Sequence, residues 1–151
     1  MRLLSLLLFV IMVISIVSCG ETRVSQCNRL NQVVNKISAL PAPKDGQGWI
    51  QLASQMEAIG AELRGLKLQD PVLVDGQQKL VALTTEAARS AAELGRAIQT
   101  QNNSARNQAI AKIEQLRQKE APIVNAINQH CSSQARTTYP RIANSRSLSI
   151  L

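Results

Sequence analysis

Between residues 49 and 67, apolar side chains recur at alternating intervals of three and four residues. This spacing places them along one side of an α-helix, in a seam that packs against neighbouring helices at a shallow angle. A half-buried strand would need apolar residues at every second position, which this stretch lacks. The pattern predicts a helix from Trp49 to about Lys67, with inward residues Trp49, Leu52, Met56, Ile59, Leu63 and Leu66.

Three more stretches show helical spacing, and we expect helices from Glu21 to Leu40, from Pro71 to about Gln101, and from Ser104 to Cys131. Two prolines and two glycines within 41–48 end the first helix. Asp70 and Pro71 form a helix start signal, since the aspartate can cap and proline needs no donor in the first turn. The inward residues we predict are Val24, Cys27, Leu30, Val34 and Ile37; Leu73, Gln77, Leu80, Thr84, Ala87, Ala91, Leu94 and Ile98; and Ala109, Ile113, Leu116, Ile123 and Ile127.

The links between these helices are short, so consecutive helices must run antiparallel. We therefore expect an all-α fold, an up-down-up-down four-helix bundle spanning residues 19–132. The middle of the third helix is lined by alanines (Ala87, Ala88, Ala91 and Ala92), where either a helix could approach closely or a large side chain such as Trp49 or Met56 could fill the space. Ser104 is the expected cap of the fourth helix, and Pro122 should kink it.

Residues 1–18 have the features of an export signal. Arg2 supplies a positive start, and the apolar run from Leu3 to Val17 is short for a membrane-spanning helix of about 20 residues. The run ends in Ile16-Val17-Ser18-Cys19, which resembles the lipobox of bacterial lipoproteins. The resemblance implies cleavage after Ser18 and a thioether-linked diacylglycerol on Cys19, hence an extracytoplasmic, membrane-anchored protein in the periplasm or on the surface of a bacterium. Two alternatives stay open: cleavage after Gly20 with release, or an uncleaved anchor helix.

If Cys19 is acylated, Cys27 and Cys131 remain as an even pair in an oxidising compartment, where disulfides persist. We expect a disulfide between them, with two unpaired buried thiols as the alternative. The bundle topology places the start of the first helix and the end of the fourth at the same pole. The two expectations therefore agree, although they rest on different residues.

From residue 133 onward the helical spacing ends, and we expect 133–151 to be a flexible basic tail carrying Arg136, Arg141 and Arg146. Its last apolar residues are Leu148, Ile150 and Leu151, and whether they dock on the bundle is open. The net charge of +7 falls to +3 over residues 19–132 once Arg2 and the three tail arginines are removed. With no basic cluster on one face and no aromatic stacking platform, we expect no nucleic-acid binding.

Residues that could carry chemistry are few. The chain has one histidine and no Glu-x-x-His or Cys-x-x-Cys motif, so we expect no metal site, no haem and no other cofactor. His130 has no recognisable nucleophile partner and is expected to be a surface or end-cap residue. Glu120 falls on the inward side of its helix, where it could face a buried arginine or, as we expect, reach solvent. These observations argue against an enzyme.

We expect a binding or structural module for a membrane-associated protein partner, with the loop 41–48 as its contact region. Lys44, Asp45 and Trp49 are the candidate contact residues. Alternatives are a small-ligand carrier with a cavity among the alanines, and a secreted helical protein whose tail binds anionic surfaces. A small lipobox-bearing four-helix bundle is also similar in layout to the Q-type extrinsic lipoprotein of cyanobacterial photosystem II. That resemblance rests on no shared motif and carries no residues over.

Overall fold

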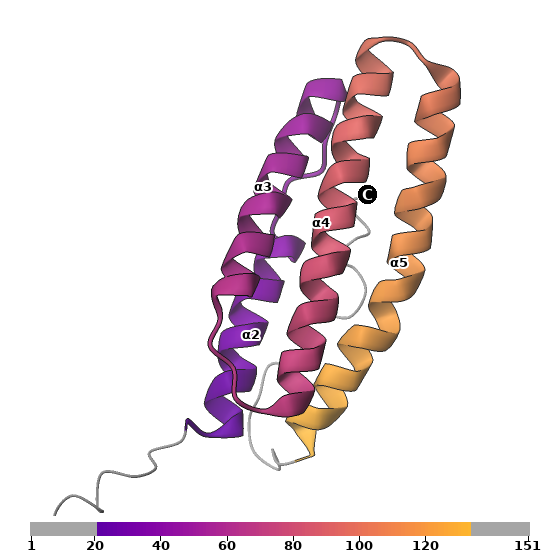
Figure 1. Ribbon diagram of the computed structural model, residues 1–151. Coiled ribbons are helices and arrows are strands. Elements are labelled where there is room, and N and C mark those ends of the chain that lie inside the picture. Colours follow the sequence, from indigo (N-terminus) through magenta and orange to yellow (C-terminus); the bar gives the residue numbers. More distant parts are fainter. Residues whose placement is uncertain (1–20, 134–151) are drawn as a thin grey trace, which may run out of the picture.

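A computed structural model of the chain describes residues 21–133, and within them the expected all-α bundle is confirmed. The helices run up, down, up and down, and each packs beside the next (Figure 1). The predicted signal segment, Cys19 and residues 134–151 lie outside the described residues. None of the helices within 21–133 combines the length and apolar composition needed to cross a membrane. The helices are α2 (Arg23–Ser38), α3 (Gly46–Gly65), α4 (Pro71–Gln99) and α5 (Asn103–Ser132).

Each helix begins at a side-chain cap, and one of these caps differs from the prediction. Asp70 caps α4 as expected, and Asp45 caps α3 by accepting from the N–H of Gly48 at 2.7 Å. The α5 cap is Asn102 rather than Ser104, because the Asn102 side chain accepts from the N–H of Ala105 at 3.0 Å. Asparagine is as good an N-cap residue as serine. The helix therefore begins after Asn102, and Ser104 lies inside its first turn.

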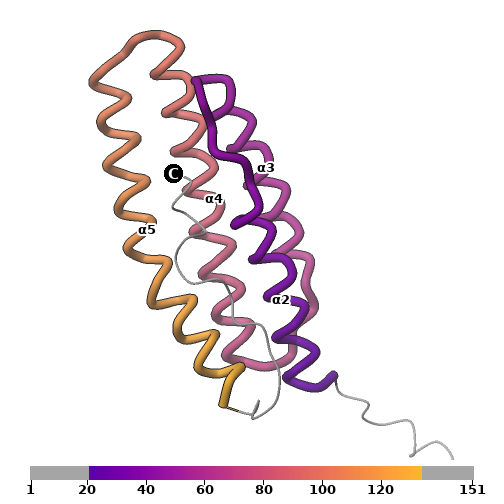
Figure 2. The backbone as a smooth tube through the Cα atoms, turned by 180° about the vertical axis from the view of Figure 1, so that it is seen from behind, coloured from indigo at the N-terminus to yellow at the C-terminus, as the bar shows by residue number. Residues whose placement is uncertain are grey.

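The helices differ in length, which divides the bundle into two unlike halves. α2 has only 16 residues, whereas α4 has 29 and α5 has 30. α2 therefore accompanies only the half nearest its own start, and residues 39–45 continue beside the others to the beginning of α3 (Figures 1 and 2). The half that holds α2 contains the largest core cluster, which joins all four helices through Cys27, Leu30, Val33, Val34, Ile37, Ile59, Leu63, Leu73, Leu80, Val124 and Ile127.

In the other half, large side chains fill the strip of alanines on α4. Met56 and Leu52 of α3 and Leu116 of α5 pack against Ala87 and Ala88, and all five are buried. Of the two alternatives that the sequence left open, large side chains, Met56 among them, pack against Ala87 and Ala88. Trp49 is half-buried and packs against this cluster and against a second one, formed by Leu94, Ala109 and Ile113.

Glu120 differs from the prediction that it reaches solvent. The residue is only 3% exposed, and its Oε2 atom has no hydrogen-bond partner. Burial raises the pKa of this carboxyl, although the charge of Arg117 acts in the opposite direction. The physical reason is that α5 continues through Pro122, so the helical spacing from Leu116 to Val124 carries Glu120 into the interior.

Candidate interaction surfaces

The predicted disulfide is confirmed and defines one pole of the bundle. Cys27 near the start of α2 is bonded to Cys131 near the end of α5, with their Cα atoms 6.0 Å apart. We call this end, which also includes residues 66–70 before α4, the disulfide pole. It is the end at which the described chain begins, at Glu21 (Figure 1).

Asp70 joins three helices at the disulfide pole. As the α4 cap it accepts from the N–H groups of Val72 at 3.0 Å and Leu73 at 3.3 Å. The same carboxylate lies 3.1 Å from Nε of Arg23 on α2 and 2.9 Å from Nε2 of His130 on α5. Partial burial acts to raise the pKa of Asp70, but the hydrogen bonds from His130, Leu73 and Val72 and the charge of His130 together lower it.

Gln26 adds a second tie between α2 and the link before α4. Its side-chain carbonyl accepts from the backbone N–H groups of Gln69 at 2.6 Å and Asp70 at 2.9 Å. Its amide donates to the backbone oxygen of Glu21 at 3.0 Å, so both polar atoms of this buried side chain have a partner. Its buried place among these groups indicates a structural role. His130, predicted as a surface or end-cap residue, is a partly buried end residue that belongs to the same network.

The predicted contact loop lies toward the opposite pole, where it borders a cavity of about 310 Å³ formed with the first turns of α3. Lys44 is exposed there, so its ammonium group can reach a partner. Asp45 is exposed but is also the α3 cap, and Trp49 is anchored against two core clusters. Of the three predicted contact residues, Lys44 alone neither caps a helix nor packs against a core cluster of the described residues.

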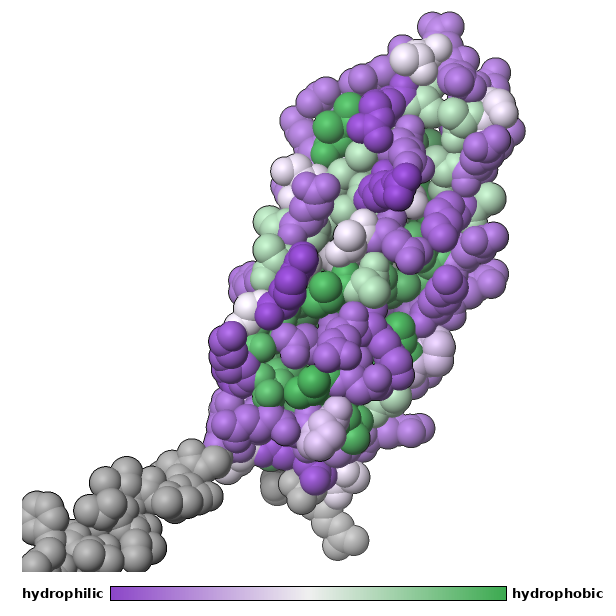
Figure 3. Space-filling view, in the orientation of Figure 1, coloured by the Kyte–Doolittle hydropathy of each residue, from purple (hydrophilic) through white to green (hydrophobic). Residues whose placement is uncertain are grey.

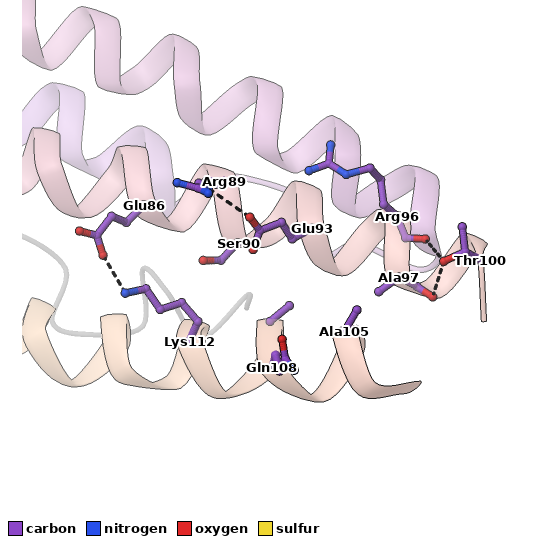
Figure 4. Close-up of a pocket in the computed structure, with 11 residues that line it drawn as sticks. Glu86, Arg89, Ser90, Glu93, Arg96, Ala97, Thr100, Ala105, Gln108 and Lys112 are labelled. Carbon is purple, nitrogen blue, oxygen red and sulfur yellow. Dashed lines mark hydrogen bonds and ion pairs between the residues drawn. The ribbon is translucent and has the colours of Figure 1, made fainter. Parts of the chain in front are cut away.

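A larger groove, missed by the sequence analysis, runs between α4 and α5 in the half that α2 does not reach. Its volume is about 810 Å³ (Figure 4). We call it the α4–α5 groove. The side chains that line the groove between the two helices include short ones, which leave the space open. They are Ser90 and Ala97 on α4 and Ala105 and Ala109 on α5.

Charged residues border this groove. Lys112 reaches across from α5 to Glu86, with Nζ and Oε2 3.2 Å apart, and Arg89 pairs with Glu93 along α4 at 3.1 Å. In Figure 4 the guanidinium of Arg96 points away from α5. Glu86 and Glu93 are 49% and 46% exposed. The α4 border of the groove therefore presents two acids, each held in an ion pair, together with the bases Arg89 and Arg96.

On the face shown in Figure 3, hydrophilic residues cover most of the surface, and hydrophobic residues show in the areas between the helices. Among residues 21–133, the large apolar side chains with substantial exposure are Val72 (43%) and Ile110 (45%), on different helices. No group of three or more His, Cys, Asp or Glu side chains that could hold a metal ion occurs within the described stretch.

Comparison with known proteins found no matching protein family, no matching curated protein and no matching solved structure.

Proposed function

We propose that this protein is a lipid-anchored, extracytoplasmic helical bundle that binds or supports a membrane-associated protein partner. Lipid on Cys19 would hold the disulfide pole at the membrane, and the opposite pole would face the partner. The proposal combines the lipobox-like sequence with the arrangement of the bundle.

The observation that carries the proposal is the disulfide between Cys27 and Cys131. Disulfides persist in oxidising compartments and are rare where cellular reductants keep thiols reduced. The bond therefore supports export, independently of the leader sequence. It also leaves Cys19 as the remaining cysteine of the three in the chain, available for acylation.

The position of the disulfide supports membrane attachment at the same pole. Cys19 precedes Glu21 by two residues, which limits its distance from the bundle to less than about 10 Å. Acyl chains at Cys19 would therefore attach close to the most strongly cross-linked part of the molecule. More than one acyl chain is enough for stable attachment without a spanning helix.

The loop 41–48 at the far pole supports a role in binding. Loops positioned by a rigid scaffold are common binding elements. In the structure, residues 46–48 of the predicted loop form the first turn of α3, and residues 41–45 lead into it. Lys44 is its exposed charged residue without a capping role. An acidic patch on the partner would complement the positive charge of Lys44.

Anchoring is tested by labelling the intact protein with radioactive palmitate in cells that export it. We expect incorporation in the parent chain and in Cys27→Ala, and none in Cys19→Ala. The Cys27→Ala variant is the matched control because it removes a cysteine without touching the lipobox. Absence of label from the parent chain would refute the anchor.

Partner binding is tested by crosslinking in the native membrane, comparing Lys44→Glu with Lys67→Glu. Both variants reverse one exposed lysine charge, but Lys67 lies at the disulfide pole. We expect Lys44→Glu to reduce capture of the partner at least tenfold, and Lys67→Glu to leave it unchanged. Equal capture by both would contradict this placement of the contact.

The carrier alternative placed a ligand among the alanines in the middle of α4, where Met56, Leu52 and Leu116 pack against Ala87 and Ala88. The alternative of a tail that binds anionic surfaces concerns residues outside the described part of the chain.

A further inference from the structure

The outward side of α4 carries a line of exposed side chains that neither the anchor nor the loop 41–48 uses. Their spacing alternates between four and three residues, which aligns them along one side of the helix, next to the α4–α5 groove. A line with this spacing is the kind along which one helix packs against another. We call it the α4 stripe, and it consists of Ala82, Glu86, Arg89, Glu93, Arg96 and Thr100.

The charges of the α4 stripe complement themselves when their order is reversed. Glu86 lies five residues before Ala91, and Arg96 lies five residues after it. Arg89 and Glu93 lie two residues before and two residues after the same position. Two copies of α4 that run antiparallel, with a twofold axis level with Ala91, therefore set each acid opposite a base of the other copy. A parallel pair would set like charges opposite each other, which is unfavourable.

Arg96 is the charged residue of the stripe that lacks an opposite charge within one copy. Its guanidinium points away from α5 (Figure 4), and none of the ion pairs in the described part of the chain involves it. Within its own copy, Glu86 pairs with Lys112. Glu93 pairs with Arg89. Exposed pairs of this kind contribute little to stability, so exchanging them for pairs between two copies costs little.

The charge balance of the stripe also favours a second copy over a partner of one charge. Its two acids and two bases make it neutral, so a second copy adds no net charge to it. The adjoining groove, with a volume of about 810 Å³, offers room for side chains that reach across. Ala97 and Ala109 in its lining are only 4% and 3% exposed. The methylene groups of an arginine can lie on such an apolar surface while its guanidinium stays at the border.

The position of the stripe along α4 allows the overlap. α4 ends at Gln99, so Thr100 of one copy comes level with Ala82 of the other. The overlap then lies mainly in the half of the bundle that α2 does not reach. The two disulfide poles lie at opposite ends of the pair, and lipid on both copies would be attached at these opposite ends.

We propose that the protein forms a twofold-symmetric, antiparallel dimer through the α4 stripe. Glu86 of each copy pairs with Arg96 of the other. Arg89 of each copy likewise pairs with Glu93 of the other, so that the interface holds four ion pairs. The dimer depends neither on the lipid anchor nor on a contact at the loop 41–48.

The test measures the dissociation constant of the dimer by sedimentation of the intact protein in mild detergent. Glu86→Arg and Arg96→Glu should each raise this constant at least tenfold, since each sets two pairs of like charges opposite each other. The double variant Glu86→Arg/Arg96→Glu should return it close to the parent value, because opposite charges face each other again. Glu57→Arg and Arg64→Glu, equal charge changes at exposed positions of α3, should leave it unchanged.

The direction of the two copies is tested with a photo-crosslinking amino acid in place of Ala82, followed by mass-spectrometric mapping. We expect a crosslink to the peptide that contains Thr100. Within one copy these two positions are about 27 Å apart along the helix at 1.5 Å per residue, so such a crosslink reports a second copy. A parallel dimer would instead give crosslinks between the two positions 82.

Circular dichroism of each variant establishes that the bundle has folded before the constants are compared. A parent protein that stays monomeric at every concentration measured would overturn the proposal. A dimer that ignores the charges at positions 86 and 96, or that crosslinks in the parallel direction, would overturn it as well.

Discussion

At the scale of single residues, Asp70 does the most to define the disulfide pole. One carboxylate caps α4, lies beside Arg23 of α2 and meets His130 of α5, while its backbone N–H donates to Gln26. Removing this carboxylate is costly, because each of its hydrogen-bonding partners would be left with an unpaired polar atom. The sequence predicted the capping role, but the contacts with Arg23 and His130 depend on packing between helices.

Asp70→Ala should therefore lower the free energy of unfolding by about 1–2 kcal/mol, the usual cost of a lost cap. Because the folded-state pKa of Asp70 is lowered, its contribution is present above its ordinary pKa and is lost as the pH falls through the lowered value. Urea unfolding at neutral and acidic pH measures both effects. Asp75→Ala, which removes an exposed carboxylate one turn along, should change the stability little.

Glu120 should have the opposite pH dependence. Its pKa is raised by burial, so the folded state holds the proton more tightly and loses stability as the pH rises from the ordinary pKa through the raised one. Glu120→Met removes the buried carboxyl and should increase the stability at pH 7 by about 1 kcal/mol. Urea unfolding between pH 4 and pH 8 is the measurement.

The matched control for this prediction is Glu114→Met, which removes an exposed carboxylate of the same helix that is paired with Arg117. It should not reproduce the gain. A loss of stability in Glu120→Met at neutral pH would mean that the buried carboxyl is stabilised by its surroundings. The sequence placed Glu120 on the inward side of α5, but composition alone did not show that the helix continues through Pro122 and keeps Glu120 inside.

At the scale of the helices, α3 and α4 approach each other closely where Gly46 and Gly95 meet. A Cβ atom on Gly95 would lie 2.6 Å from the backbone oxygen of Gly46 and 2.8 Å from Cγ1 of Ile50. Because a backbone oxygen cannot move aside as a flexible side chain can, this contact fixes the distance between the two helices. The sequence analysis used Gly46 only as part of the turn after the first helix and did not single out Gly95, since spacing within one helix says nothing about its distance from another.

Gly95→Ala should destabilise the bundle by about 1–3 kcal/mol, because the added methyl forces α3 and α4 apart. Gly60→Ala is the matched control, since its Cβ would meet Thr84 at an ordinary 3.7 Å. The higher helix propensity of alanine should make that variant equal to or more stable than the parent. Thermal unfolding of the two variants separates them, and similar losses in both would argue against the close contact.

Helix spacing predicted the interior well where the interior is apolar, as along α3 from Leu52 to Leu63. It also placed Gln77 in the α4 seam, but could not say what a buried amide would do there. In the structure Gln77 donates to the backbone oxygens of Leu63 at 2.6 Å and Leu66 at 3.0 Å, which satisfies carbonyls at the end of α3. Such a role appears only when two helices are placed side by side.

At the scale of the whole molecule, the disulfide compensates for a short first helix. α2 has 16 residues and accompanies only half of the bundle, so it buries less apolar surface than the longer helices. The bond to Cys131 closes a loop with a sequence separation of 104 residues. The topology and the cysteine pair were both predictable from the sequence, whereas the open α4–α5 groove follows from the unequal helix lengths and the small residues that face each other.

Replacing both cysteines, Cys27→Ala/Cys131→Ala, should lower the free energy of unfolding by about 2–5 kcal/mol, since the unfolded chain regains its freedom. Urea unfolding under non-reducing conditions measures the change. The parent protein under reducing conditions should behave like the double variant. No difference between reduced and oxidised parent protein would show that the bond contributes nothing to stability.

The central claim, that lipid and disulfide fasten the same pole of an exported bundle, is tested most directly by the intact mass of the protein purified from its native membrane. The predicted mass is that of a chain beginning at Cys19 with a diacylglycerol group, less two hydrogens for the bond between Cys27 and Cys131. A chain that still begins at Met1, carries no lipid and has three free thiols would contradict the claim.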